Sequence, residues 1–289
     1  MITRTYIDGG LGNQLFQIAF SLYLREELSI DSKLDISLLE SKNQHGGIDY
    51  RVIFGDILEV NNNSSFSSIF ISKTYFSKCF RTFLRAFKVK NFFQFMFYDF
   101  DAKSSFETVI NDDVKVSSNY LGYFQFPDAA IIVKDIMNDK IDSYRNKKFS
   151  LEKQKEFCNK IAIHVRRGDF LSSDCDSHTV FDVDYLKRAI NCFPQNSEFI
   201  VFSDDISWCR KNLALQNVSF SSEISAYDDF LAMTLCSSYI LTASTFGFWG
   251  AFFNKDFDND LRVVVPKNVP VTFLSKENLN KMNWELQYV

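Results

Sequence analysis

The sequence predicts a layered α/β fold made of two lobes. Near the N-terminus, a β-prone segment is followed by a glycine-rich turn and by apolar residues at helical spacing. From residue 161 onward, strand-like and helix-like segments alternate, which indicates a parallel sheet with crossover helices. The 289 residues suffice for one large or two moderate domains. A highly charged segment at 139–160 is typical of an amphipathic helix or a linker, so we expect lobes at 1–150 and 151–289.

Composition and charge restrict the class of function. The chain has 36 acidic and 32 basic residues, whereas nucleic-acid binding proteins are usually basic, so we expect no nucleic-acid partner. The N-terminus lacks the apolar region of a signal peptide, and no apolar run approaches the ~20 residues of a membrane span. None of the six cysteines forms a CxxC pair, so zinc-knuckle spacing is absent. Isolated thiols are typical of a reduced protein, and we expect a cytoplasmic location.

One stretch differs sharply from the rest of the chain. Residues 70–98 contain nine Phe, six Lys or Arg and no acidic residue. We interpret them as a basic aromatic helical stretch of the first lobe, with aromatic side chains inside and solvated cations outside. The alternative is a surface that binds an anionic bilayer, which would bring the protein into peripheral contact with the cytoplasmic face of the inner membrane.

The first strand, at 5–7, ends in a glycine turn, and the helix after it carries apolar periodicity over 15–28. Gly10 and Gly12 allow a ligand to approach the backbone, and Asn13 lies in the same turn. The helix N-terminus then offers unpaired N–H groups to an anion. A turn that binds nothing is the alternative interpretation.

The same turn nearly fits a dinucleotide-binding fingerprint. Gly10 and Gly12 match the first two glycines of GxGxxG, but the third position is Leu15. Asp31 or Asp35, about 20 residues further on, could serve as the acid that binds a ribose in such folds. An NAD(P)-dependent oxidoreductase is therefore an alternative function.

The strand at 161–165 leads into a basic turn, HVRRGD at 164–169. In open α/β sheets, ligands bind beyond the carboxyl ends of the strands. Alternation along the strand places His164 and Arg166 on one side and Arg167 on the other. The permanent charge and planar donors of Arg166 suit a phosphate or a leaving diphosphate, and Asp169 is expected to orient an arginine or contact a base. A surface ion-pair cluster is the alternative.

A strand at 198–202 precedes the acidic turn Ser203-Asp204-Asp205. A carboxylate there either accepts hydrogen bonds from a guanine or ribose edge or caps the next helix, expected at 207–213. Five DxD patterns occur, but none follows an apolar strand, so we expect no metal site.

The remaining elements continue the alternation, with helices and strands expected at 184–192, 227–236, 239–242 and 262–265. After the strand at 239–242 come Ser244, Thr245 and Phe246. Hydroxyls and the amides of a helix start make a cradle for an anion, and the Phe246 ring can stack on a flat ligand. An N-capped core helix is the alternative interpretation.

Several segments, in this order, resemble the α-1,2-fucosyltransferases of glycosyltransferase family 11. GGLGNQLFQIAF is similar to the family's GGLGNQMFQYAF, and HVRRGDF to its HxRRxD signature. GYFQFP, FSDDISWCRKNL and STFGFWGAFFN resemble further segments of the family. The resemblance covers roughly residues 5–255, with Thr245, Gly247 and Phe248 standing where the family has Ser, Ser and Trp.

The resemblance implies a GT-B-like fold, in which two Rossmann-like lobes face a central cleft. The first lobe would lie on the acceptor side and the second would bind the GDP-sugar. The implied reaction is an inverting transfer of L-fucose from GDP-β-L-fucose to O2 of a galactose-like residue, with no metal or other cofactor. The acceptor would be an oligosaccharide or a lipid-linked glycan. A non-catalytic module that binds glycans or a membrane surface is a further alternative.

The resemblance also implies roles for single residues. Arg166 would hold the diphosphate and stabilise its leaving charge, while Asp169 would orient Arg166 or touch the donor. Asp8, one residue before the glycine turn, is a candidate general base. The expected donor-binding positions are Gly10, Gly12, Asn13, His164, Arg166, Asp204, Ser244, Thr245 and Phe246.

Overall fold

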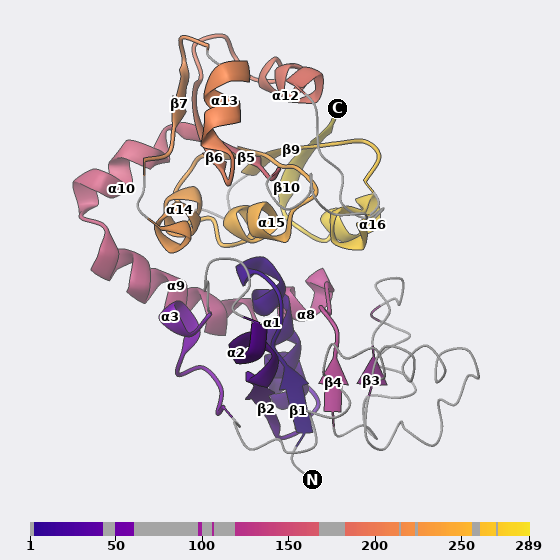
Figure 1. Cartoon of the computed structure of the whole chain (residues 1–289). Helices are drawn as coiled ribbons and strands as arrows, with labels where there is room; N and C mark the ends of the chain where they lie inside the picture. Colours follow the sequence, from indigo (N-terminus) through magenta and orange to yellow (C-terminus); the bar gives the residue numbers. More distant parts are fainter. Residues whose placement is uncertain are drawn as a thin grey trace. The chain divides into compact units, whose positions relative to one another are not determined.

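The computed structural model divides the chain into two compact units, Met1–Met137 and Asn138–Val289, called unit 1 and unit 2 below. The structure describes residues 3–42, 50–60, 98–99, 106, 119–167, 183–213, 215–222, 225–255, 261–269 and 271–289. Figure 1 shows strands and helices of both units in the colours of the sequence.

Unit 1 is built on a parallel sheet of four strands. Their order is β2-β1-β4-β3, and every neighbouring pair runs parallel. The strands are β1 (Thr3–Tyr6), β2 (Ser32–Asp35), β3 (Tyr98–Asp99) and β4 (Asn119–Leu121). The chain moves from β1 to β2 and later returns to the other side of β1 with β4. The carboxyl ends of β1 and β4 therefore flank a point where the strand order reverses.

The long helix α1 (Leu11–Glu26) packs its predicted apolar face inside unit 1. Phe20 stacks on Phe124 with ring centroids 4.2 Å apart and meets the edge of Tyr120 at 5.5 Å. This aromatic cluster joins α1 to β4 and to the segment after it. The shorter helices of the unit are α2 (Ser37–Lys42), α3 (Arg51–Phe54) and α8 (Pro127–Ile132).

Unit 2 contains a parallel sheet of six strands in the order β10-β9-β8-β5-β6-β7. The chain runs outward from β5 through β6 to β7, then returns to the other side of β5 with β8. This is the strand order of a dinucleotide-binding Rossmann sheet, with its switch point between β5 and β8. The strands are β5 (Lys160–Val165), β6 (Glu198–Ser203), β7 (Val218–Phe220), β8 (Ser238–Ile240), β9 (Leu261–Val265) and β10 (Trp284–Tyr288).

Helices cover both faces of the unit 2 sheet (Figure 1). On one face, α12 (Val183–Ile190) and α13 (Ile206–Asn212) pack against a core that includes Ile163 and Val201. On the other lie α14 (Ala226–Met233) and α15 (Thr245–Phe252), which begins soon after β8. A short 3₁₀ helix, η2 (Thr272–Leu274), and α16 (Lys276–Leu279) connect β9 to β10.

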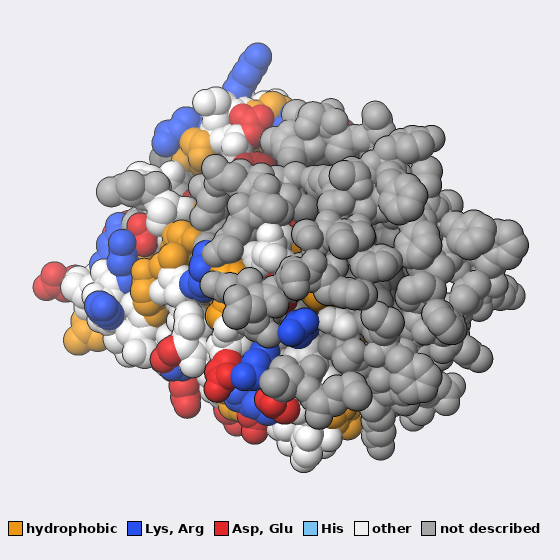
Figure 2. Space-filling view, turned by 60° about the horizontal axis from the view of Figure 1, so that its bottom comes forward, with side chains coloured by type: hydrophobic (Ala, Val, Ile, Leu, Met, Phe, Trp, Pro, Cys, Tyr) orange, Lys and Arg blue, Asp and Glu red, His pale blue; other side chains and the backbone are white. Residues whose placement is uncertain are grey.

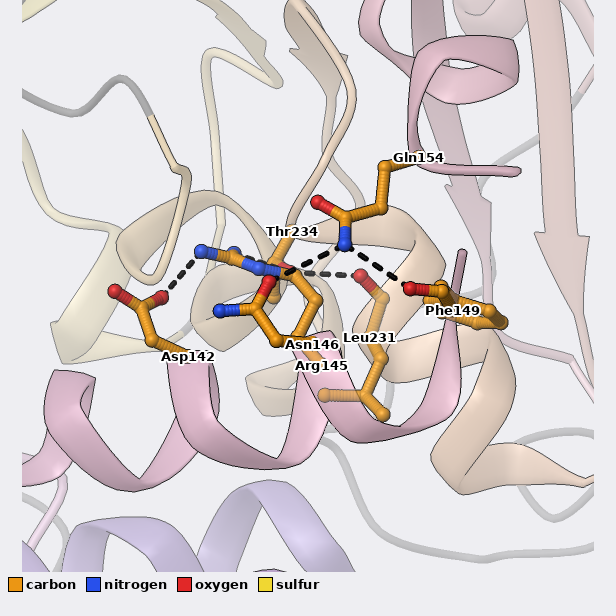
Figure 3. Close-up of polar contacts among 7 residues, drawn as sticks. All are labelled: Asp142, Arg145, Asn146, Phe149, Gln154, Leu231 and Thr234. Carbon is orange, nitrogen blue, oxygen red and sulfur yellow. Dashed lines mark hydrogen bonds and ion pairs between the residues drawn. The ribbon is translucent and has the colours of Figure 1, made fainter. Parts of the chain in front are cut away.

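The charged segment expected as a helix or a linker forms two helices, α9 (Lys134–Lys148) and α10 (Leu151–Cys158). Within unit 2, α9 is fixed by Arg145, whose side chain is only 3% exposed. Its guanidinium donates to the Thr234 hydroxyl at 3.1 Å and pairs with Asp142 (Figure 3). Thr234 in turn donates to the Leu231 carbonyl of α14 at 2.7 Å.

The turn between α9 and α10 is held by one buried amide. Gln154 of α10 donates to the Phe149 carbonyl at 3.1 Å and to the Asn146 side chain at 3.2 Å (Figure 3). Lys148 adds an ion pair of 3.0 Å to Asp228 at the start of α14. The last part of α9 and all of α10 are therefore anchored on α14, and both belong to unit 2.

These features confirm the predicted α/β class, with two Rossmann-like units. The structure divides the chain after Met137, whereas the charge pattern predicts a boundary after residue 150. Of the stretch 70–98, only Tyr98 is described, so its predicted helical character lies outside the described residues. Where cysteines are described, at 158, 192, 209 and 236, each is a free thiol. No helix among the described ranges is long and apolar enough to span a membrane.

The described surface mixes charges of both signs. On the face in Figure 2, basic and acidic side chains of the described residues alternate with small apolar areas. Examples of such pairing in unit 1 are Lys33 with Glu59, and Arg25 with Glu26. This distribution fits the formal charge of −4.

We expect Arg145→Ala to lower the free energy of unfolding by about 2–4 kcal/mol, since it removes a charge-assisted hydrogen bond and leaves a cavity. Urea denaturation measures the change. Lys147→Ala, on the exposed side of the same helix, is the matched control, and we expect a change within about 0.5 kcal/mol. Equal effects of the two substitutions would show that Arg145 does not anchor α9.

Candidate functional site

The residues predicted to carry the chemistry of unit 2 gather at the carboxyl edge of its sheet. His164 lies near the end of β5, and Arg166 follows directly after that strand. Ser244, which follows β8, is the N-cap residue of α15. Because β5 and β8 are neighbours, these side chains lie at the switch point of the sheet, where α/β proteins bind ligands.

Asp204 holds the basic turn after β5 in place. One of its carboxylate oxygens lies 3.1 Å from Nη1 of Arg166, and the other accepts the backbone N–H of Arg167 at 2.9 Å. The exposed fractions are 28% for the Arg166 side chain and 23% for Asp204. The guanidinium is thus oriented by a carboxylate and still reaches solvent.

Arg167 has a different environment. Its guanidinium lies 3.7 Å from the centroid of the Trp208 ring on α13, and its Nε lies 3.6 Å from the Asp205 carboxylate. Asp205 also caps α13 by accepting the N–H of Trp208 at 3.0 Å. In the acidic turn, Asp205 therefore caps α13, whereas Asp204 forms an ion pair with Arg166. The predicted separation of His164 and Arg167 to opposite sides of β5 is confirmed.

His164 is buried, with 4% of its surface exposed, on the side of the sheet that α15 covers. Its ring stacks on Phe246 with centroids 5.3 Å apart and planes 27° from parallel. Burial, and secondly the positive charge of Arg166, lower the pKa of His164 from 6.5 to about 3. The imidazole is therefore neutral at physiological pH. Its Nδ1 atom is buried and has no hydrogen-bond partner.

Gly247 allows α15 to approach this ring. A Cβ atom at position 247 would lie 2.9 Å from Nδ1 of His164 and 3.1 Å from its Cγ. Since real Cβ atoms do not come so close, any larger residue at 247 forces the imidazole or the helix to move. Position 247, where the resembled family has serine, is glycine in this chain and lies in tight contact with His164.

The N-terminus of α15 has the features of an anion site. Ser244 is its N-cap residue, but the serine side chain makes no capping hydrogen bond. The first turn contains no acidic residue, and the Thr242 hydroxyl just before it is buried without a partner. Free N–H groups and the helix dipole together favour a phosphate at such a position. Thr245 and Phe246 occupy this first turn.

The glycine turn of unit 1 is shaped by Asp8 and Gly9. Gly9 adopts φ +83°, a conformation that side-chain-bearing residues rarely adopt, and its N–H donates to Asp8 Oδ1 at 2.8 Å. Gly10 is the N-cap residue of α1, and Gly12 and Asn13 lie in the first turn of the helix. Asn13 Oδ1 accepts from the Gln125 amide at 3.0 Å. These predicted positions come together on unit 1.

Two buried glutamines in α1 support the turn, and sequence reasoning assigned them no role. Gln17 accepts the N–H of Asp8 at 3.0 Å and donates to the Gly122 carbonyl at 2.8 Å, so it joins the ends of β1 and β4. Gln14 donates to the Gly9 carbonyl and accepts the N–H of Tyr50, both at 2.7 Å. The sequence signal that could have identified them is the presence of polar residues among the apolar positions of a helix that follows a glycine turn.

The other two predicted residues, Asp169 and Asp35, differ in whether the structure describes them. Asp169 lies outside the described residues. Asp35, the candidate ribose acid, is fully buried, and its Oδ1 accepts hydrogen bonds from the N–H and the hydroxyl of Ser37. Asp35 therefore helps to begin α2 and is inaccessible to a ribose.

Comparison with known proteins gives one family. Residues 2–287 match the family model described as Glycosyl transferase family 11. The match includes the described strands and helices of both units from β1 to β9.

Two relatives from Escherichia coli align with almost the whole chain. O-antigen biosynthesis glycosyltransferase WbnK is 26% identical, over 96% of this chain and 98% of its own. Alpha-1,2-colitosyltransferase is 25% identical, over 96% of this chain and 94% of its own. Human galactoside alpha-(1,2)-fucosyltransferase 1 is 34% identical over 102 residues, which is 32% of this chain and 28% of the human one.

We expect the lowered pKa of His164 to make stability depend on pH. Between about pH 3 and 6.5 the unfolded chain binds a proton at this residue that the folded protein does not. Stability from this group is complete above pH 6.5 and decreases as the pH falls, by about 2 kcal/mol between pH 7 and pH 5.

Urea unfolding at pH 7 and pH 5, in wild type and His164→Gln, measures this dependence. The variant should lose about 2 kcal/mol less than wild type over the same interval, whatever its stability at pH 7. Identical pH dependence in the two proteins would rule out a buried neutral imidazole.

Proposed function

The chain belongs to glycosyl transferase family 11, and on that premise we propose that it transfers L-fucose from GDP-β-L-fucose to O2 of a galactose-like residue of a glycan. The α-1,2 linkage is supported by two relatives whose names carry it, one acting with colitose and one with fucose. Both the full-length match and the local human match support a transfer of this type.

The arrangement around Arg166 is the observation that carries the proposal. A fixed guanidinium held by Asp204 lies two residues beyond His164, and the ring of His164 packs on the first turn of α15. The helix start offers N–H groups, and Arg166 offers a permanent positive charge. Together they suit the diphosphate of a sugar nucleotide. We therefore assign the donor to unit 2 and the acceptor to unit 1.

In the proposed reaction, the acceptor O2 attacks C1 of fucose from the face opposite the diphosphate. The bond from O2 to C1 forms as the bond from C1 to the phosphate oxygen breaks, which inverts the β-linked donor to an α-linked product. The electron pair leaves with GDP, and the O2 proton passes to a base. Arg166 and the α15 amides stabilise the charge that develops on the leaving diphosphate.

We propose that the reaction needs no metal, because Arg166 and the N–H groups at the start of α15 can stabilise the negative charge of the leaving diphosphate. Asp8 is proposed as the base that receives the O2 proton. One Asp8 oxygen accepts the Gly9 N–H at 2.8 Å, which fixes the carboxylate beside the glycine turn. Ser244, Thr245 and Phe246 are proposed to surround the donor phosphates, with His164 and Asp204 close to the nucleoside. Gly10, Gly12 and Asn13 are proposed to contact the donor from the glycine turn of unit 1.

Colitosyl transfer is the second candidate, because the colitosyltransferase relative covers nearly the whole chain. The two candidates share the linkage and differ in the donor sugar. The NAD(P)-dependent alternative is weakened, since Asp35 is buried and engaged with Ser37 and the third glycine position of the fingerprint is Leu15. An oligosaccharide or lipid-linked glycan is the proposed acceptor, and a membrane contact through 70–98 remains part of the proposal.

A donor comparison tests the function directly. We expect GDP release in EDTA when purified protein is given GDP-fucose and a β-galactoside, and NMR of the product should show an α-linked fucose on O2. GDP-mannose and UDP-galactose are the control donors. Faster turnover with GDP-colitose would select the second candidate. No turnover with any GDP-linked sugar would refute both.

We expect Arg166→Ala to lower kcat about 10²- to 10³-fold, because it removes a preorganised cation from the leaving group. Asp204→Asn should lower kcat by a smaller factor, since it loosens Arg166 without removing it. Steady-state kinetics with GDP-fucose give both values. Arg188→Ala, an exposed arginine on α12, is the matched control and should leave kcat within about two-fold. Full turnover in Arg166→Ala would overturn the proposed role.

A further inference from the structure

Unit 2 has an open pocket at the carboxyl ends of β9 and β10, in the yellow part of Figure 1. Its volume is about 690 Å³. Lys267 and Asn268 follow β9, Ser275 and Lys276 begin α16, and Tyr288 ends β10. None of the residues that line the pocket belongs to the proposed donor site.

The charged side chains that line this pocket are both cationic. Among the described residues, the ammonium groups of Lys267 and Lys276 have no ion-pair partner, and no acidic side chain lines the pocket. The Tyr288 hydroxyl is buried and also lacks a hydrogen-bond partner. Burial raises the pKa of Tyr288, so the phenol keeps its proton and can donate. The phenol is therefore an unsatisfied donor beside the pocket.

The other lining groups suit a sugar. The Asn268 amide can both donate and accept, and the Ser275 hydroxyl, which accepts the N–H of Asn278 at 3.3 Å, can still donate its own proton. Val269 and Leu274 add apolar surface, which can contact the C–H face of a sugar ring. The two lysines and the phenol can bind the anionic group of such a ligand, and the other lining groups can contact its sugar ring.

The pocket is separate from Arg166 but on the same edge of the sheet. Two strand spacings separate β5 from β9, which corresponds to about 10 Å. The pocket therefore lies about 10 Å from the Arg166 end of β5 and closer to the start of α15, which follows the neighbouring strand β8.

From these contacts we propose that Lys267, Lys276 and Tyr288 form a second binding site on unit 2, which takes a sugar bearing a phosphate or a carboxylate. The site is independent of the nucleotide-binding residues. It gives unit 2 a means to select anionic glycans or sugar phosphates that the transfer reaction itself does not require.

Calorimetric titration of the full-length protein tests the site. The protein is first saturated with GDP, so that Arg166 is occupied, and is then titrated with galactose 1-phosphate, galacturonate or galactose. We expect the first two to bind and galactose to bind at least about ten-fold more weakly. Tighter binding of galactose 1-phosphate than of galacturonate would identify phosphate as the preferred anion, and the reverse would identify carboxylate.

Variants locate the binding. The double substitution Lys267→Gln/Lys276→Gln should weaken galactose 1-phosphate at least about ten-fold and leave GDP affinity unchanged. Tyr288→Phe should weaken it by a smaller factor. Lys255→Gln, an exposed lysine just after α15, is the matched control and should change affinity less than about two-fold.

Three outcomes would overturn the proposal: no binding of either anionic sugar, equal binding of galactose, or full affinity in the double variant. Loss of the binding in Arg166→Ala without GDP would also overturn it, because the ligand would then occupy the donor site. If GDP itself fails to bind, the proposed function is in question. The lysine variants still report on the pocket in that case, because their effect is measured with the anionic sugar alone.

Discussion

The carboxylate of Asp204 binds two consecutive residues of the neighbouring strand end, and the arrangement of the unit 2 site depends on it. One oxygen pairs with Arg166 at 3.1 Å, and the other accepts the Arg167 N–H at 2.9 Å. An arginine after a strand has many rotamers in solvent, and a carboxylate contact removes most of them before any ligand arrives. The two adjacent arginines therefore have different side-chain partners. Arg166 pairs with Asp204, whereas the Arg167 guanidinium packs on the Trp208 ring.

The second constraint is the close packing of α15 on β5. With glycine at 247, the helix start approaches His164 to within van der Waals contact, and Phe246 covers the imidazole. This packing excludes water from the ring and keeps it uncharged beside Arg166. A protonated imidazole would add a second positive charge at a buried position next to Arg166. The desolvated histidine therefore adds no positive charge next to Arg166.

The elements that carry the site were predictable because their sequence signals are local. Apolar β-prone runs before HVRRGD and before Asp204 predict β5 and β6 within one residue of the observed ends. The pairing of Asp204 with Arg166 was not predictable, since it depends on the register between two strands.

Two strands of unit 2 were not predicted from the sequence. The short β7 and the half-exposed β10 lack a clear apolar run. Arg145 looks solvated in a charged segment, and only docking on α14 buries it. The partners of Gln14 and Gln17 at Tyr50 and Gly122 were not predictable either, because contacts between distant parts of the sequence leave no local pattern.

The anchoring of α9 has a consequence for recombining this chain with its relatives. The charge pattern suggests a junction near residue 150, but Arg145, Lys148 and Phe149 make their contacts with α14 and α10 inside unit 2. A chimera joined at 150 would combine an α9 from one parent with an α14 from another and separate Arg145 from the threonine that receives its hydrogen bond. Joined after Met137, the exchanged half carries its own anchor, so unit 2 can be transferred whole without rebuilding that interface.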